Sequence, residues 1–402
     1  MSAWLEKISR SFSEDEVVSL AQELIRRPSH WDVPHREKEA MDYLCSFLDK
    51  HELAYEKQHI TGDLYNVLVT LNGQGNGKRL LFNGHMDTVP PYDMEFPPFE
   101  ANIVDGYIQG RGAVDMKGPI AAMVTSLLVL KRLALKLKGD VIFAAVVGEE
   151  GRSEGTEALV LNNFQADGAI IGEPSNFNYA VAHRGLEWLE IEFFGKRAHS
   201  GDLERGVSAI SMAARFITAL EERYIPLLKN RYNPLMGPSI INFGRIEGGT
   251  QPSTVAEYCK LQLDRRYVDT ESNEQVIREL EDFIKYMKDT VPGFDASLKV
   301  MDSSKMLKLR HVPMVTREDD PLVTTLLKNV ELVVGRKPTC TTRRGWTDAG
   351  LLNHYLKIPA VICGCGDIAY SHSKNEQVSI EQLVQAVKIY TLTAIDFCSQ
   401  SR

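Results

Sequence analysis

A short apolar run that ends in glycine and is followed by polar residues occurs four times along this chain, in RLLFNGH (79–85), VIFAAVVGEE (141–150), GAIIGEPS (168–175) and AVICGCG (360–366). Runs this uniformly apolar are typical of strands that are buried on both faces of a sheet. Helical patterns lie among these runs, at 118–136, where Pro119 falls in the first turn, and at 376–398. The alternation of buried strands with helices predicts an α/β fold with a mostly parallel, doubly wound sheet.

The middle of the chain follows a different pattern, in which apolar and polar residues alternate. LEWLEIEFF (186–194) is predicted to be a half-exposed strand. Helices are predicted at 207–224 and 272–289, and a pair of strands at 239–249 and 256–267. A chain of 402 residues is long enough for two domains. We therefore predict an inserted α+β domain at 184–298 and a catalytic domain at 1–183 and 299–402.

The charge and the terminal sequence limit the partners of the chain. A net charge of −8 and a pI near 5.8 argue against nucleic acid or an anionic membrane as the main partner. The start, MSAWLEKISRSFSEDEVV, has no apolar core of a secretory signal, and the apolar runs at 119–130 and 141–148 are too short to span a bilayer. The six cysteines form no CxxC pair. We therefore expect a cytoplasmic protein with reduced thiols.

Histidine and carboxylate side chains follow the predicted buried strands. They are His85 and Asp87 after the first run, Glu149 and Glu150 after the second, Glu173 within the third and His372 just after the fourth. Loops at the carboxyl ends of parallel strands converge on one crevice, so we expect these side chains to meet. Asp115, in the glycine-rich loop GRGAVDMKG before a predicted helix, joins them.

These side chains predict a site for divalent metal ions. Two imidazoles and several carboxylates suit zinc, and one carboxylate can bridge two ions. Asp87, two residues from His85, can accept the second N–H of that imidazole and fix its tautomer. Of the adjacent Glu149 and Glu150, one can bind metal while the other faces the water as a general base.

Each residue also has an ordinary structural interpretation. His85 alone could be a hydrogen-bonded structural histidine, Asp115 a charge at a helix N-terminus, and Glu173 a turn cap. Their placement after successive buried strands favours the metal site. The context HSKNE favours His372 over His354 and His311 as the second histidine ligand.

Six stretches also resemble the motifs of a known family. They are GHMDTVP, GRGAVDMKGPIAA, GEEG, GEPS, RAHSG and SHSKNE, which follow one another from about residue 84 to 376. In this order they resemble the zinc aminoacylase and carboxypeptidase family, which includes acetylornithine deacetylase, succinyl-diaminopimelate desuccinylase, aminoacylase and carboxypeptidase G. The resemblance implies a zinc-exopeptidase-like catalytic domain and an inserted lid and dimerisation domain. It also implies two divalent metal ions, zinc first with cobalt or manganese as alternatives, and a homodimer.

The resemblance implies a role for each matching residue. His85 and Glu173 would hold one zinc, Glu150 and His372 the other, Asp115 would bridge both, Asp87 would orient His85, and Glu149 would be the general base and acid. It further implies a cis peptide bond after Asp115.

The inserted domain is implied to supply two substrate-binding residues. His199, in RAHSG, would stabilise the oxyanion, often from the partner subunit. Arg266, in LDRRY, would bind a substrate carboxylate on domain closure, although the adjacent Arg265 leaves the register open. Three positions depart from the family: Ser253 and Ala256 stand where an Asn and a Pro are frequent, and Trp346 where a smaller residue is usual.

Together these observations predict a metal-dependent amidohydrolase that cleaves the amide of an N-acyl amino acid, as an acetylornithine deacetylase does. Its substrate would be a small amide that carries a carboxylate. A dipeptidase or exopeptidase with the same site is one alternative, and a deformylase of a non-amino-acid amide is another. A catalytically silent binding protein is disfavoured by the full ligand set with Glu149, and a nicotinamide-dependent oxidoreductase by the lack of a GxGxxG after a strand.

Overall fold

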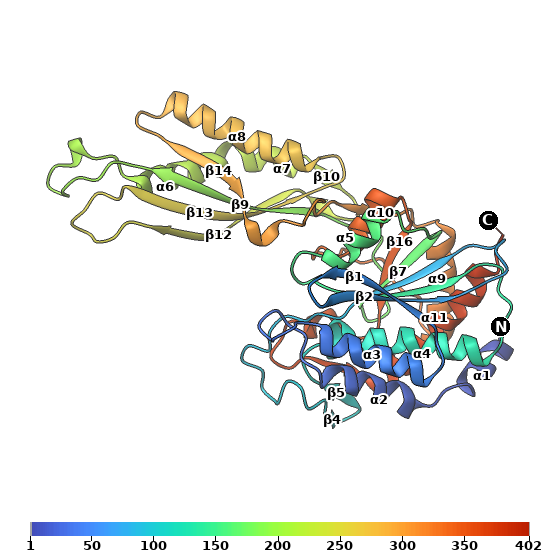
Figure 1. Cartoon of the computed structure of the whole chain (residues 1–402). Coiled ribbons are helices and arrows are strands. Elements are labelled where there is room, and N and C mark those ends of the chain that lie inside the picture. Colours follow the sequence, from blue (N-terminus) through green and yellow to red (C-terminus); the bar gives the residue numbers. More distant parts are fainter. Residues whose placement is uncertain (1, 402) are drawn as a thin grey trace. The chain divides into compact units, whose positions relative to one another are not determined.

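The computed structural model describes residues 2–401, which form two compact units (Figure 1). Unit 1 contains the chain up to Val181, residues 315–341 and the chain from Thr347 onward. Unit 2 contains Ala182–Met314 and Thr342–Trp346. The short strand β15 (Met314–Val315) lies where the chain passes from unit 2 back to unit 1.

The core of unit 1 is a six-stranded sheet in the order β1-β2-β6-β3-β7-β16. Strands β6, β3, β7 and β16 are parallel to one another, which confirms the mostly parallel sheet. All residues of these four strands are buried, as expected for a sheet covered on both faces. At one edge, β2 pairs antiparallel with β6, and β1 antiparallel with β2. The strands are β1 (Tyr55–Thr61), β2 (Leu64–Leu71), β3 (Leu80–His85), β6 (Val141–Val146), β7 (Gly168–Pro174) and β16 (Ala360–Gly364).

Helices cover both faces of this sheet, so the predicted α/β class is confirmed. Figure 1 shows α3, α4 and α11 on one face and α5 and α10 on the other. A small sheet of β17, β5 and β4 lies beside them. The helices of unit 1 are α1 (Ser2–Ser9), α2 (Glu14–Ile25), α3 (Lys38–Lys50), α4 (Gly118–Arg132), α5 (Glu154–Leu161), α9 (Pro321–Val334), α10 (Ala349–Leu356) and α11 (Ile380–Cys398). The small strands are β4 (Ile103–Val104), β5 (Tyr107–Gln109) and β17 (Gln377–Ser379).

The apolar stretch that includes the central helix of unit 1 is longer than the runs counted in the sequence. The stretch Ala113–Arg132 is long and apolar enough to cross a membrane, contrary to the prediction that no run was. Its apolar window is completely buried within the protein, the usual position of a core helix. The expectation failed because it counted only the run at 119–130 and left out the buried turn η1 (Ala113–Lys117) that precedes α4.

Two predicted helices have different ends in the structure. Helix α4 stops at Arg132 rather than 136, before Ala134, which has a positive φ of 48°. Helix α11 starts at Ile380 rather than 376, because residues 377–379 pair with β5 and the Ser379 side chain caps the helix. Glu376 is thereby free of the helix and its carboxylate turns into the core.

Unit 2 is built around an antiparallel sheet in the order β12-β13-β9-β14. In β13 buried and half-buried residues alternate from Cys259 to Tyr267. The buried side chains pack with α6 and α8 in one apolar cluster that includes Leu261, Phe216 and Leu280. The helices of this unit are α6 (Ala209–Ala219), α7 (Ile225–Lys229) and α8 (Asn273–Thr290), with a wide turn, η3 (Leu220–Tyr224), between the first two. The strands are β8 (Ala182–His183), β9 (Gly185–Phe194), β10 (Tyr232–Asn233), β11 (Gly237–Pro238), β12 (Ile240–Gly248), β13 (Tyr258–Tyr267) and β14 (Ala296–Val300).

Unit 2 extends beyond the predicted end at residue 298 for a physical reason. Strand β14 pairs with β9 as far as Val300, and the Met301 N–H then donates to the Trp188 carbonyl over 2.9 Å. Further on, the Tyr267 hydroxyl donates to the His311 carbonyl over 3.0 Å. These bonds hold the chain to the sheet of unit 2 up to Met314.

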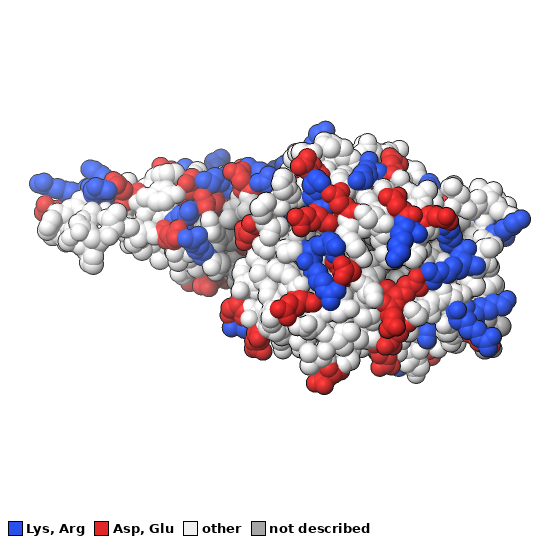
Figure 2. Space-filling view, turned by 60° about the horizontal axis from the view of Figure 1, so that its bottom comes forward, with Lys and Arg blue, Asp and Glu red and all other residues white. Residues whose placement is uncertain are grey.

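Charged side chains of both signs are mixed on the surface seen in Figure 2. Over the part of unit 1 that this view shows, Lys and Arg lie among Asp and Glu. The described residues of this face therefore form no extended region of a single charge.

Candidate metal centre

Histidine and carboxylate groups converge in unit 1 at the carboxyl ends of its parallel strands. Three overlapping groups have ligand atoms within 4.8 Å of one another: His85, Asp115 and Glu173; His85, Glu149 and Glu150; and Asp115, Glu150 and His372. Five of these residues are the predicted metal ligands, and the sixth, Glu149, is the predicted general base. The structure therefore brings the predicted residues of unit 1 together in one place.

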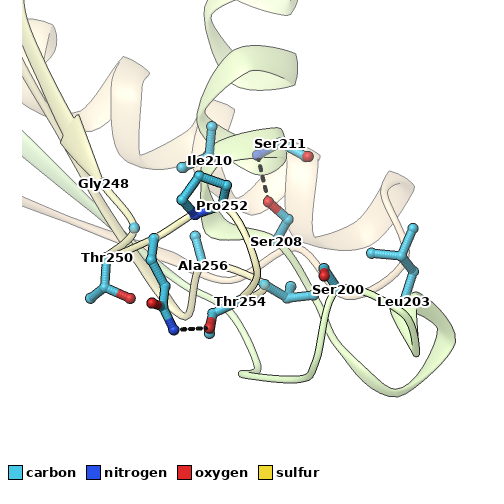
Figure 3. A pocket seen from close by; sticks show the side chains of 13 residues that line it. Ser200, Leu203, Ser208, Ile210, Ser211, Gly248, Thr250, Pro252, Thr254 and Ala256 are labelled. Carbon is cyan, nitrogen blue, oxygen red and sulfur yellow. Dashed lines mark hydrogen bonds between the residues drawn. The ribbon is translucent and has the colours of Figure 1, made fainter.

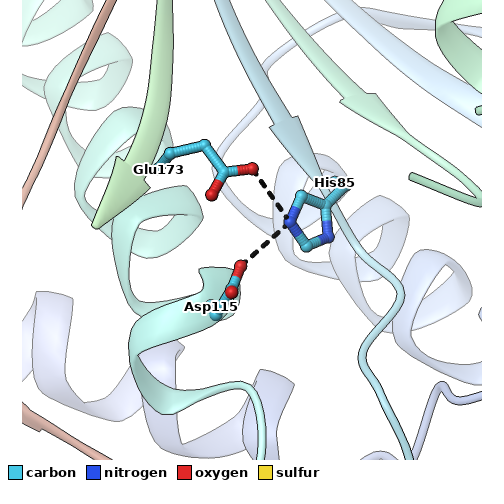
Figure 4. Close-up of side chains that lie close together, drawn as sticks. All are labelled: His85, Asp115 and Glu173. Atoms are coloured by element: carbon cyan, nitrogen blue, oxygen red, sulfur yellow. Dashed lines mark hydrogen bonds and ion pairs between the residues drawn. The ribbon is translucent and has the colours of Figure 1, made fainter. Parts of the chain in front are cut away.

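The first group is deeply buried. His85 ends β3, Glu173 lies near the end of β7, and Asp115 lies in η1. The Nε2 atom of His85 is 3.1 Å from Asp115 Oδ1 and 3.5 Å from Glu173 Oε1 (Figure 4). All three side chains are nearly inaccessible to solvent and point toward one another.

The second group shares Asp115 with the first. The Nε2 atom of His372 is 2.8 Å from Glu150 Oε1 and 3.4 Å from Asp115 Oδ2. The two oxygens of Asp115 thus face two different histidines, Oδ1 toward His85 and Oδ2 toward His372. This is the arrangement that a bridging carboxylate requires. The Ser371 hydroxyl also donates to Asp115 Oδ2.

The charges of the cluster are strongly coupled. Burial opposes ionisation of Asp115, but His372 and His85 hold the pKa of this carboxyl well below its usual range. Burial likewise opposes protonation of His85, but Asp115, Asp87 and Glu173 hold its pKa well above the usual range. A cluster with this many carboxylates requires positive charge at its centre, which a divalent cation supplies.

Glu149 differs from the ligand residues in its electrostatics. Burial raises the pKa of its carboxyl well above the usual range, against the opposing effect of His85, and the charges of Glu173 and Glu150 add to the rise. A general base that must later act as an acid needs a pKa raised toward the working pH.

Asp87 contacts both His85 and the Glu149–Glu150 turn. The Nδ1 atom of His85 is 3.0 Å from the backbone carbonyl of Asp87 and 3.5 Å from its Oδ1. The carboxylate also accepts the backbone N–H of Glu149 over 3.1 Å and that of Glu150 over 2.8 Å. The nearer partner of the imidazole is therefore the Asp87 backbone carbonyl, while the Asp87 carboxylate, which the sequence predicted to orient His85, mainly holds the backbone of the turn that carries Glu149 and Glu150.

Glu376 is a site residue that the sequence patterns missed. Its buried Oε1 accepts the backbone N–H groups of Val114 and Asp115, each over 3.1 Å, and its other oxygen pairs with buried Arg111. The peptide bond that follows Asp115 is cis, as the family resemblance implied. Glu376 was part of the quoted motif SHSKNE, but the helical pattern assigned it to a helix start, which hid its role.

The predicted substrate-binding residues lie in unit 2. Arg265 is fully buried and pairs with Glu271, whereas Arg266, on the other face of β13, is half-buried and donates through Nε to Asp264 over 2.8 Å. Of these two arginines, Arg266 is therefore the one that a ligand can reach. The Arg184 guanidinium lies nearby. Burial, together with the charge of Arg266, lowers the pKa of Arg184.

His199 lies in an exposed loop of unit 2. Its Nδ1 accepts the Gly201 N–H over 3.0 Å, and the residue bridges to Thr254. Thr254 and Ser200, the residue after His199, line a cavity of about 510 Å³ beside the start of α6 (Figure 3). Trp346, one departure from the family, is packed within unit 2, where its Nε1 donates to the Val312 carbonyl over 2.9 Å.

The histidines and carboxylates that meet at the strand ends define a metal-dependent hydrolase. Comparison with known families gives the particular one. Residues 81–396 match the model of peptidase family M20/M25/M40, and the chain belongs to this family, whose members hydrolyse amide bonds.

Several known proteins are similar to almost the whole chain. An N-formyl-4-amino-5-aminomethyl-2-methylpyrimidine deformylase from Halalkalibacterium halodurans is 28% identical, covering 96% of this chain and 95% of that protein. An acetylornithine deacetylase from Myxococcus xanthus is also 28% identical, with 89% of this chain and 92% of that protein covered. Among solved structures, an M20 family metallo-carboxypeptidase from Sulfolobus solfataricus has a TM-score of 0.80 at 20% identity, covering 96% of this chain and 99% of the other. This last similarity supports the fold.

Proposed function

We propose that this enzyme removes the acyl group from a small N-acyl amino acid whose free carboxylate it recognises, with two divalent metal ions at the centre in unit 1. The observation that carries the proposal is the Asp115 carboxylate, whose two oxygens face His85 and His372. His85 and Glu173 would hold one ion, Glu150 and His372 the other, with Asp115 between them. The mixed imidazole and carboxylate donors suit zinc first, and cobalt or manganese as alternatives.

The protein residues divide the remaining work. Bound divalent ions would polarise the amide carbonyl and make water a better nucleophile near neutral pH. Glu149 takes a proton from the attacking water and returns it to the leaving amine. Asp87 keeps His85 oriented and holds the Glu149–Glu150 backbone.

Residues of unit 2 are proposed to select the substrate. Arg266 has a planar guanidinium that can grip a carboxylate with two hydrogen bonds. Arg184 and Arg344 lie close enough to act on one another electrostatically, while Asp264 supplies the opposing charge. The excess of positive charge supports an anionic substrate. His199 is proposed to stabilise the oxyanion.

A second candidate is a deformylase of a small formylated amine. This candidate is supported by the similarity of the chain to the pyrimidine deformylase from Halalkalibacterium halodurans. A deformylase of the same name from Bacillus subtilis is 29% identical to the chain. Ser253 in place of the family asparagine is consistent with an amine that carries no acid. A cytoplasmic location and a homodimer formed through unit 2 complete the proposal.

A substrate panel separates the two candidates. The protein, loaded in turn with zinc, cobalt and manganese, is assayed on N-acetyl and N-succinyl amino acids, their carboxamides, dipeptides and N-formyl-aminomethylpyrimidine. We expect the free-acid N-acyl amino acids to be cleaved and their carboxamides to be poor. Preference for the formylated pyrimidine would select the deformylase, and cleavage of dipeptides alone would select a peptidase.

A further inference from the structure

Three successive backbone N–H groups in the loop that carries Glu149 are held by two buried carboxylates. The Gly148 N–H donates to Glu37 Oε1 over 3.1 Å, and the next two N–H groups donate to Asp87. Asp87 was expected at the site because it follows His85. Glu37 comes from the N-terminal end of α3, more than a hundred residues away, and no motif pointed to it.

Arg36 extends this contact to the other end of the loop. Its Nη2 is 3.0 Å from Glu37 Oε1, and its Nη1 is 3.3 Å from Glu154 Oε1. Glu154 is the first residue of α5, where the loop ends. Glu37, which is fully buried, and Arg36 therefore tie the start of the loop to its end.

The loop has little room to adjust between these two ends. Gly148 has a φ of +79°, and a Cβ atom added there would lie 1.9 Å from Glu154 Oε2. Its carbonyl accepts the N–H groups of Gly151 and Ser153 over 3.2 and 2.6 Å. A turn closed in this way transmits a shift of Gly148 directly to the next residue, Glu149.

We propose that Glu37 is a positioning residue for amide hydrolysis, which holds Glu149 in place through the Gly148 N–H. The inference rests on the proposed role of Glu149 as general base. Glu37 contacts the loop at Gly148, whereas the ligand Glu150 has its own anchors in the N–H bond to Asp87 and the contact with His372. Removing it should therefore lower kcat while KM and metal content stay the same. A displacement of about 1 Å at a reacting group can cost about 10²-fold in rate.

Two substitutions of Glu37 separate its hydrogen bond from its charge. Burial and the Asp87 carboxylate raise the pKa of Glu37 to about 8, so glutamine matches the neutral acid in shape and keeps an acceptor. We expect Glu37→Gln to retain near wild-type kcat and Glu37→Leu to lose about 10- to 100-fold. If Glu37→Leu does not fold, Glu37→Asp keeps a carboxyl group but loses reach, and it should show the same loss. Unchanged kcat in the folded variant would overturn the proposal.

A double-mutant cycle with Glu149→Gln gives a readout that a merely structural role would not change. If Glu37 acts through Glu149, Glu37→Leu should have no further effect on kcat in the Glu149→Gln background. An equal loss in both backgrounds would contradict the inference. Unchanged kcat in Glu149→Gln alone would instead contradict the proposed function. Glu16→Leu, which removes a remote carboxylate paired with Arg132, is the matched control and should leave kcat unchanged.

Discussion

At the scale of single residues, the site depends on which atom of each carboxylate faces which partner. Asp115 presents one oxygen to each histidine, whereas Glu149 and Glu150, adjacent in sequence, have different surroundings. Glu150 pairs with His372, whereas Glu149 is half-buried near Glu173 and His85, and its pKa is raised. Two neighbouring glutamates can therefore serve as ligand and base.

The first prediction separates these two roles. Glu149→Ala should keep both metal ions and the fold but lose about 10²- to 10⁴-fold in kcat, the usual contribution of a general base. Glu150→Ala should lose one metal ion. Metal analysis of the purified variants beside steady-state kinetics checks both. The reverse pattern of metal loss would exchange the two assignments.

The second prediction concerns substrate recognition. Arg266→Ala should lower kcat/KM for N-acyl amino acids by about 10²-fold, and Arg266→Lys should restore only part, because an ammonium lacks the bidentate grip. Arg245→Ala, which removes an exposed arginine of β12 paired with Glu247, is the control and should have no effect. Equal cleavage by wild type of a substrate and its carboxamide would show that the carboxylate is not recognised.

At the scale of elements, the buried strands and the acidic or imidazole residues at their ends could be predicted, because both follow from local patterns. The contacts of Glu376 and Glu37 could not, since each carboxylate bonds to a backbone segment remote in sequence. The choice between Arg265 and Arg266 needed the register of β13, in which alternate residues turn to opposite faces. The antiparallel edge of the sheet was also missed, because β1 is largely polar.

The third prediction concerns the pH dependence of unit 2. Burial, with the charges of Arg266 and Arg310, lowers the pKa of His311 to about 3. Below pH 6.5 the unfolded chain binds a proton that the folded one does not, so stability is lost as pH falls through that value. At pH 5 this effect lowers the free energy of unfolding by about 2 kcal/mol.

Thermal unfolding between pH 5 and 7.5 tests this effect. His311→Gln should flatten the acid side of the profile, whereas His59→Gln, at an exposed histidine of β1, should not. An unchanged acid limb in His311→Gln would show that other groups govern it.

At the scale of the whole molecule, the two units divide the chemistry. Unit 1 contains all the proposed metal ligands and the base, and unit 2 contains Arg266 and His199. Strand β12 is an edge strand of the sheet in unit 2, and it carries the exposed side chains of Ile240 and Ile246. Unpaired edges of this kind favour association with a second copy.

The fourth prediction tests whether His199 serves a partner subunit. Glu149→Ala and His199→Ala protomers, each inactive alone, are mixed under conditions of subunit exchange. If His199 acts across the dimer, each heterodimer gains one complete site and activity returns. No recovery after proven exchange would place His199 in its own subunit's site or show it to be structural.

The most direct test of the whole account is metal titration of the chelated protein, with hydrolysis of an N-acetyl amino acid as the readout. We predict that activity returns as zinc is added and reaches its maximum at about two ions per protomer. Asp115→Asn, which alters the carboxylate between the two histidines, should recover little at any zinc concentration. Full activity in the chelated protein, or a full response in Asp115→Asn, would contradict the account.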